Sequence, residues 1–374
     1  MNLFTYEKVY RAYLRCKRKK SNTLVHAKFV VQLERNLYQL LQDLKSREYK
    51  VGRFRCFIVT QPVMREVFAG NFRDRIVHHL LINEIEPLID PLFIDDSLAC
   101  RKGKGNLTGI RRLRSGIQSY RDQHGEYPTY LQMDISSFFM SIQQEKLFQL
   151  VETTLKKIYL KKFKSENDKT VNRLWFEEVL FLCRTIIFND PTEHYIRKGD
   201  PTLAMKLRPG KSLFHVPQGQ GLPIGNLSSQ FFANVYLNEL DQFIKRELKQ
   251  KRYIRYVDDF VILGKKEELI LAKGKIVDFL RIELGLSIND KKTKMASAKT
   301  GIDFVGYVVR DKYLLPRRRC VQKFRSRLKN LELKKIEEII SFNCSYRSHC
   351  GYLRLGKHFK LLEDIHTDMI DYHT

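Results

Sequence analysis

Apolar residues recur along the chain with two periods, and each period predicts a different kind of element. A period near 3.6 predicts a helix over 28–47, and further helices over 73–86 (ending near Pro87), 143–163, 170–188, 228–248 and 268–284. A period of two predicts a hairpin over 50–68 and strands over 129–135 and 302–309. Short strands interspersed with amphipathic helices predict an α+β fold.

Three further stretches are distinguished by their composition. Residues 98–118 begin as a glycine-rich loop and continue as a basic helix. Residues 189–218 place prolines and glycines between short apolar pieces, and we interpret them as a hairpin and a loop. Beyond Pro316 the pattern is helical and strongly basic.

The most apolar strand pair of the chain contains two adjacent carboxylates, Asp258 and Asp259. A buried carboxylate is costly unless it is paired or bound to a metal ion, and two neighbours raise each other's pKa. In the strand over 129–135, alternation places Asp134 opposite its apolar neighbours, where it can converge with Asp258. The three aspartates therefore predict a cation site. The alternative is that Asp258 and Asp259 are hairpin turn residues.

A site of this kind suits phosphoryl transfer. Two Mg²⁺ ions bridged by carboxylates can activate an attacking 3′-hydroxyl and neutralise a triphosphate with its leaving group. Magnesium prefers oxygen ligands and keeps several waters, so that two or three aspartates suffice. We expect two Mg²⁺ ions, with Mn²⁺ as a substitute.

Charge points to the partner. The 374 residues contain 68 Lys and Arg against 42 Asp and Glu, a net charge of +26, which favours nucleic acid as a partner. The seven cysteines form no CxxC pair, which is typical of reduced thiols in a cytoplasm. The chain shows neither an apolar stretch of membrane-spanning length nor a secretion signal. We therefore expect a soluble cytoplasmic protein that has no membrane partner.

Six ordered motifs resemble those of reverse transcriptases. Residues 72–79 resemble the N-terminal motif of prokaryotic members, 134–139 the first aspartate motif, 221–230 the loop and helix that grip template and nucleotide, 256–259 (Tyr-Val-Asp-Asp) the YxDD box, 284–293 the motif that follows it, and 304–307 the primer-grip hairpin. The string IGNLSSQFFANVYLNELD, which begins at Ile224, is similar to the reverse transcriptases of diversity-generating retroelements.

The resemblance implies a right-hand polymerase fold with an antiparallel palm sheet backed by helices and a helical thumb. The implied division is an N-terminal extension and fingers over 1–128, a first part of the palm over 129–154, a fingers/palm insertion over 155–220, the palm over 221–310 and the thumb over 311–374.

The implied activity is RNA-directed DNA synthesis from dNTPs, copying a template-repeat RNA into cDNA with errors at template adenines during mutagenic retrohoming. Template RNA, an RNA/DNA duplex and an oligomeric accessory variability protein are the implied partners. A retron, group II intron-like or CRISPR-associated reverse transcriptase is the alternative within the family. A non-catalytic RNA-binding scaffold is the alternative outside it.

The predicted site residues fall into four sets. The catalytic residues are Asp134, Asp258 and Asp259, and the metal ligands are these three with Ile135. The nucleotide-binding set is Arg101, Lys102, Phe139 (as sugar gate), Ile224, Gln230 and Lys292. The nucleic-acid-binding set is Lys17, Arg18, Lys19, Lys20, Lys104, Arg317, Arg318, Arg319, Lys323, Arg325 and Arg327. Plain alternatives remain, such as a core position for Phe139 and a generic RNA-binding loop at Arg101.

Ile224 carries a hypothesis of its own. Most bacterial relatives have Gln at this position, and Gln can hydrogen-bond the nascent base pair, whereas Ile can only pack. Losing such a contact typically surrenders about 1–3 kcal/mol of discrimination. We expect Ile224 to lower copying fidelity, unless it merely packs the palm.

Overall fold

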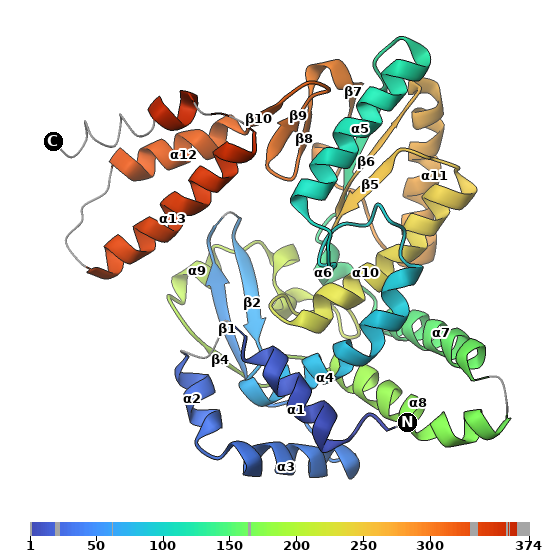
Figure 1. Ribbon diagram of the computed structural model, residues 1–374, viewed down its shortest axis with the longest axis vertical. Coiled ribbons are helices and arrows are strands. Elements are labelled where there is room, and N and C mark those ends of the chain that lie inside the picture. The colour runs from blue at the N-terminus through green and yellow to red at the C-terminus, as the bar shows by residue number, and fades with distance from the viewer. Residues whose placement is uncertain are drawn as a thin grey trace.

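The computed structural model describes residues 2–18, 23–61, 63–163, 166–329, 336–356, 358 and 360–364 (Figure 1). Within these ranges the strands form one four-stranded and two three-stranded sheets, each packed against helices. No helix in them has the length and apolar character needed to cross a membrane. The expected α+β class is confirmed.

The four-stranded sheet has a hydrophobic cluster on each of its faces. Its order is β5-β6-β3-β7, and every pairing is antiparallel. The strands are β3 (Thr129–Asp134), β5 (Tyr253–Tyr256), β6 (Asp259–Gly264) and β7 (Lys294–Ser297). Alternation along β3 sends Leu131 and Met133 into the main core, whereas Tyr130 enters a second cluster on the other face.

Helices cover both faces of this sheet. The main core joins it to α10 (Leu227–Gln242) and α11 (Lys266–Leu284). The second cluster joins it to α5 (Asn106–His124) and to a small C-terminal sheet. Two long helices, α7 (Gln144–Lys162) and α8 (Glu166–Ile187), extend the main core away from the strands. The predicted helices over these segments are confirmed, and α10 continues as a π-helical turn over Phe243–Glu247.

A second sheet has the order β2-β1-β4 and is built on the predicted hairpin of β1 (Phe54–Val59) and β2 (Arg65–Ala69). The hairpin expected within 189–218 is wrong. Only β4 (Tyr195–Arg197) forms there, and it pairs in parallel with β1, whose edge bonds to its backbone. The rest of that stretch folds into α9 (Thr202–Met205) and single 3-10 turns.

The N-terminal helices are α1 (Tyr6–Cys16), α2 (Leu24–Val30), α3 (Leu33–Lys45) and α4 (Phe72–Ile89). The single helix predicted over 28–47 is divided at Val31–Gln32, where the Asn36 side chain donates to the Phe29 carbonyl (2.8 Å) at the end of α2. The helix predicted to end near Pro87 includes Pro87 and continues to Ile89, because the Asp90 N–H bonds the Glu86 carbonyl.

The C-terminal part begins with a sheet of order β10-β9-β8, made of β8 (Ile302–Phe304), β9 (Tyr307–Val309) and β10 (Leu314–Pro316). The strand predicted over 302–309 is therefore a hairpin, which turns at Val305 and Gly306 with positive φ angles of 40° and 103°. Helices α12 (Arg318–Lys329) and α13 (Ile336–Leu355) follow, and Figure 1 shows them side by side beyond this sheet. A four-residue helix, α6 (Phe138–Ser141), completes the elements near β3.

Candidate active site

The sheet register brings the three predicted aspartates together. Asp134 ends β3 directly opposite Asp259, which begins β6. One residue further on, the Ile135 N–H donates to the Asp258 carbonyl (3.1 Å). Two strands that are far apart in the sequence thus place all three carboxylates at one end of the sheet.

The electrostatics agree with this convergence. Burial raises the pKa of Asp258, and the Asp134 carboxylate raises it further, while Lys292 and Arg65 partly offset the rise. Burial likewise raises the pKa of Asp259 to about 7, with further contributions from Asp134 and Asp258 and an opposing hydrogen bond from Gln132. Carboxylates that disfavour each other's charge in this way would be stabilised by a cation.

The backbone around the aspartates is strained. Val257 in the Asp-Asp turn has φ 58°, and Ser137, three residues after Asp134, has φ 46°. Non-glycine residues adopt such angles only where surrounding structure enforces them, and they gather at functional sites. Both departures flank the candidate carboxylates.

Polar side chains hold two of the aspartates. The Lys292 ammonium lies 2.7 Å from Asp134 Oδ2, and the Asn289 amide donates to Oδ1 (3.4 Å). The Gln132 amide donates to Asp259 Oδ1 (3.1 Å) and to the Asp303 carbonyl in β8 (2.9 Å). Sequence reasoning missed Gln132, although it precedes Asp134 by two residues on a strand and therefore shares its face.

The donor set fits Mg²⁺ in kind. Aspartate oxygens are the hard ligands that this ion prefers, and two protein ligands suffice because the ion keeps waters. In the described ranges no three His, Cys, Asp or Glu side chains lie close enough to share one ion. The charge of Asp134 raises the pKa of both Asp258 and Asp259, so the three carboxylates interact as one group. Ile135 is buried beside them.

The predicted nucleotide loop packs against the segment that follows Asp134. The Leu222 N–H donates to the Phe139 carbonyl (2.8 Å), and the Gly221 N–H donates to the Ile142 carbonyl (2.8 Å). Phe139 and Ile224 are half-buried, and both pack on one small cluster made of Phe54, Cys56, Phe68, Met140 and Leu213. The structure thus brings the proposed sugar gate and the proposed fidelity residue to one support.

Arg101 requires a correction, because its guanidinium is used inside the protein. The side chain is 7% exposed and makes five hydrogen bonds, which equals its number of N–H donors. The acceptors are the Asp90 carboxylate and the main-chain carbonyls of Asp90, Ile94 and Ser97. No donor remains for a triphosphate, so Arg101 anchors its loop instead.

The other predicted nucleotide contacts occupy varied places. Lys102 is exposed and lies 3.9 Å from Glu86. Gln230 is exposed on α10, and Lys292 is the Asp134 partner described above. Arg65 at the start of β2 was not predicted, yet it is exposed and its charge reaches Asp258.

The predicted nucleic-acid contacts are only partly available to a ligand. Lys104 is paired with Asp95, and Arg317 is paired with Asp303. Lys17 is half-buried over the Tyr13 ring, and Arg18 is exposed. On α12 the exposed cations are Arg318, Arg319, Lys323 and Arg325. Lys19, Lys20 and the Arg327 side chain lie outside the described residues.

Comparison with known proteins gives one family. Residues 64–309 match the family model described as reverse transcriptase (RNA-dependent DNA polymerase). The chain is 23% identical over 302 residues to nuclear intron maturase 1, mitochondrial, of Arabidopsis thaliana, covering 66% of the chain and 41% of the relative. It is 22% identical over 300 residues to the putative COX1/OXI3 intron 2 protein of Saccharomyces cerevisiae, covering 73% and 34%. The chain thus spans less than half of either relative.

A solved structure shares the fold. The telomerase of Candida albicans, determined with a fragment of telomeric RNA, superposes with a TM-score of 0.50 at 12% identity. The match covers 94% of this chain and 65% of the telomerase chain. At this identity the likeness concerns the fold alone, and it agrees with the right-hand polymerase architecture expected from the motifs.

Proposed function

The chain belongs to the reverse transcriptase family, and from that premise we propose that it polymerises DNA on an RNA template at Asp134, Asp258 and Asp259. The observation that carries the proposal is the antiparallel register that sets Asp134 opposite Asp259. The carbonyl of Asp258 accepts a hydrogen bond from the N–H of Ile135, the residue after Asp134. The opposite-face position that strand alternation predicts for Asp134 supports the same assignment.

Each side chain has a distinct part in this proposal. Asp134 and Asp258, with the Ile135 main chain, would hold Mg²⁺, and Asp259 would complete the set. The bound ions would activate the primer hydroxyl and neutralise the triphosphate. Lys292 would exchange its contact with Asp134 for one with the nucleotide, and the exposed Arg65 would approach the same triphosphate from β2.

The architecture supports a division of labour along the chain. We assign residues 1–128 to an N-terminal extension and the fingers, 129–154 and 221–310 to the palm, 155–220 to a fingers/palm insertion and 311–374 to the thumb. The four-stranded sheet is then the palm, and the β8–β9 turn, tied to Asp259 through Gln132, is the primer grip.

Primer extension on an RNA template with Mg²⁺ tests the proposal directly. Asp258→Asn should lower kcat by about 10³-fold or more, since preorganised electrostatic stabilisation of the transition state accounts for effects of this size. The matched control is Asp290→Asn, which neutralises an exposed aspartate of the adjoining motif and should leave kcat unchanged. Equal extension by Asp258→Asn and the unaltered protein would assign the extension to a contaminant, reject the site and leave the non-catalytic RNA-binding scaffold as the alternative.

Within the family we propose the diversity-generating subtype, in which a template-repeat RNA is copied with errors at adenines and an accessory variability protein assists. The string that begins at Ile224 supports it. Sequencing the cDNA made from a cognate RNA tests it. Errors confined to template adenines are expected, and Ile224→Gln should reduce them about 5-fold or more. An unchanged error spectrum in Ile224→Gln would remove Ile224 from the explanation.

A group II intron-like reverse transcriptase is the second candidate, because two of the relatives are intron proteins. The cDNA sequencing separates the two candidates, since faithful copying of intron RNA is the outcome expected for the second. Faithful copying of both a repeat RNA and an intron RNA would exclude the mutagenic subtype.

A further inference from the structure

A completely buried arginine lies next to the Asp-Asp turn. Arg255, in β5, is 1% exposed, and its partner Asp241 on α10 is 0% exposed. Burying two charges is costly, and their attraction offsets the cost only when further hydrogen bonds satisfy both groups. The structure supplies those bonds, so the pair is a specific construction within the core.

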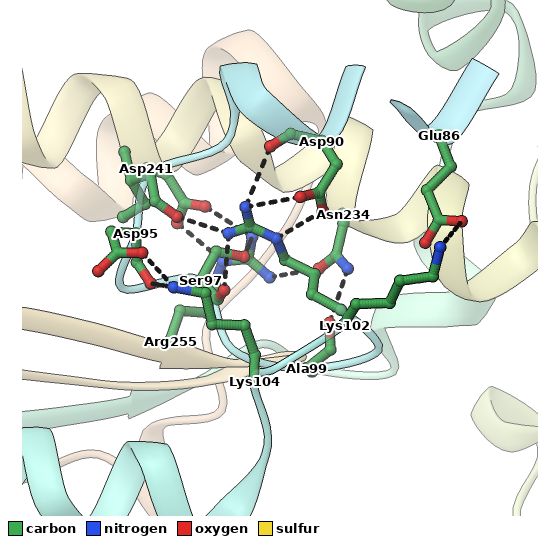
Figure 2. A network of polar contacts seen from close by, with 12 residues as sticks. Glu86, Asp90, Asp95, Ser97, Ala99, Lys102, Lys104, Asn234, Asp241 and Arg255 are labelled. Atoms are coloured by element: carbon green, nitrogen blue, oxygen red, sulfur yellow. Dashed lines mark hydrogen bonds and ion pairs between the residues drawn. The ribbon is translucent and has the colours of Figure 1, made fainter. Parts of the chain in front are cut away.

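All five N–H donors of Arg255 have acceptors. Nε and one terminal nitrogen donate to the Asp241 carboxylate (2.7 and 2.6 Å), and that nitrogen also donates to Ser97 Oγ (2.9 Å). The other terminal nitrogen donates to Asn234 Oδ1 (3.2 Å) and to the Val257 carbonyl (2.9 Å). Figure 2 shows Ser97, Asn234 and Asp241 gathered around Arg255, and we call these four residues the buried arginine network.

The bond to Val257 connects this network to the site. Val257 is the turn residue with φ 58°, an angle that costs energy for a β-branched side chain. The main chain of Arg255 is itself held, because its N–H donates to the Asp96 carbonyl (3.0 Å) and its carbonyl accepts from Leu98 (3.1 Å). A guanidinium fixed at every nitrogen therefore meets the strained residue that precedes Asp258.

We propose that Arg255 is a positioning residue that holds Val257 in its strained conformation and so aims Asp258 and Asp259 toward the reacting groups. The inference rests on the proposed site. It differs from a purely structural role because the bond to Val257 acts on the turn, whereas the bonds to Asp241, Asn234 and Ser97 act on the core.

The test removes the ion pair of the network without leaving a buried charge. The combined variant Asp241→Leu, Tyr253→Phe, Arg255→Met replaces the ion pair, and also the Tyr253 hydroxyl that donates to Asp241 (2.7 Å), with apolar groups of similar size. Such replacements of an ion pair are often neutral or stabilising, whereas Ser97 Oγ, Asn234 Oδ1 and the Val257 carbonyl each lose a donor, so the thermal midpoint should fall less than in Asp241→Leu alone. The kcat should fall about 10- to 100-fold, the scale expected for a small misplacement of reacting groups. KM for dNTP and the Kd for template–primer should change little.

Three further measurements distinguish positioning from core stability. The amide of Ile135, bonded to the Asp258 carbonyl, should exchange hydrogen faster in the combined variant than in the unaltered protein. In a Val257→Gly background the same three substitutions should cost less than about 3-fold in kcat, because glycine adopts positive φ without strain. Arg255→Lys keeps the charge but has fewer donors, and its kcat should lie between those of the combined variant and the unaltered protein.

The outcomes are separable. An unchanged kcat in the combined variant, or an equal loss in the Val257 and Val257→Gly backgrounds, would overturn the positioning role. Full activity of Asp258→Asn would instead overturn the site on which the inference rests. If the combined variant fails to fold, Arg255→Lys decides the question. Its loss of kcat is then compared between the unaltered protein and the Val257→Gly variant.

Discussion

The four-stranded sheet and the two C-terminal helices handle charge in opposite ways. Around the sheet, two arginine side chains are buried and fully hydrogen-bonded, because Arg255 and Arg101 make five hydrogen bonds each. On α12, cations such as Arg318 and Lys323 are exposed, and the small core below them contains Phe324, Cys350, Leu353 and Leu362. Catalytic groups must be held in a fixed geometry, whereas electrostatic attraction to a phosphate backbone requires only exposed positive charge.

The largest expected effect comes from breaking the buried ion pair between Arg255 and Asp241. Asp241→Leu alone leaves the Arg255 guanidinium in the core without its counter-charge, and such a loss typically costs about 3–5 kcal/mol of the free energy of unfolding. Urea denaturation followed by circular dichroism measures it. The exposed Arg281 lies 2.9 Å from Asp278, and Asp278→Leu is the matched control, expected to cost less than about 1 kcal/mol. Similar losses in both variants would contradict the distinction between buried and exposed charge.

The next effect concerns the junction of the two regions. The Tyr352 hydroxyl on α13 donates to the Gly306 carbonyl (2.5 Å) and accepts from the Arg317 N–H (2.8 Å). Tyr352→Phe removes both bonds and should destabilise the docking of α13 on the β8–β9 turn by about 1–3 kcal/mol. Hydrogen exchange should become faster over 345–355 and remain unchanged in β3 and β6. Faster exchange in all of these segments would mean that the two regions unfold as one unit.

The third expected effect is the pH dependence of the free energy of unfolding, which the Asp259 carboxyl should produce. The pKa of Asp259 is raised from 3.8 to about 7, so the folded state binds more protons than the unfolded state between these values. The free energy of unfolding should therefore decrease as pH rises from about 4 to about 7 in the absence of divalent metal. Asp259→Asn should flatten this decrease, as measured by thermal midpoints across that range. An equally steep decrease in Asp259→Asn would assign it to other groups.

The smallest expected effect concerns the exposed cations of α12. Lys323→Ala removes one exposed cation from α12 and should weaken binding to an RNA/DNA duplex uniformly across sequences. The slope of log K against log salt concentration should become shallower by about one unit. Fluorescence anisotropy at several salt concentrations measures it, and Lys251→Ala, at an exposed lysine near the start of β5, is the control. Equal slopes for all three proteins would exclude a phosphate contact at Lys323.

Sequence reasoning succeeded where one local rule was sufficient. Alternation in β3 placed Asp134 on the face opposite Leu131 and Met133, and ordered motifs indicated the family. It failed where a charged side chain could bind either a ligand or groups within the protein. Arg101 lies in a basic glycine-rich loop, yet Asp90 and three carbonyls take all its donors. The hairpin expected within 189–218 failed because β1, distant in sequence, offered an edge to β4.

The shared support under Phe139 and Ile224 has a consequence for the evolution of this protein. Both side chains pack on the cluster of Phe54, Cys56, Phe68, Met140 and Leu213, so a substitution that reshapes this cluster would affect both proposed determinants. If Phe139 excludes ribonucleotides and Ile224 permits mispairing, the rate of base misincorporation and the discrimination against ribonucleotides would change together. Selection for a different mutation rate would meet a trade-off with sugar choice, and paired substitutions would be the route around it.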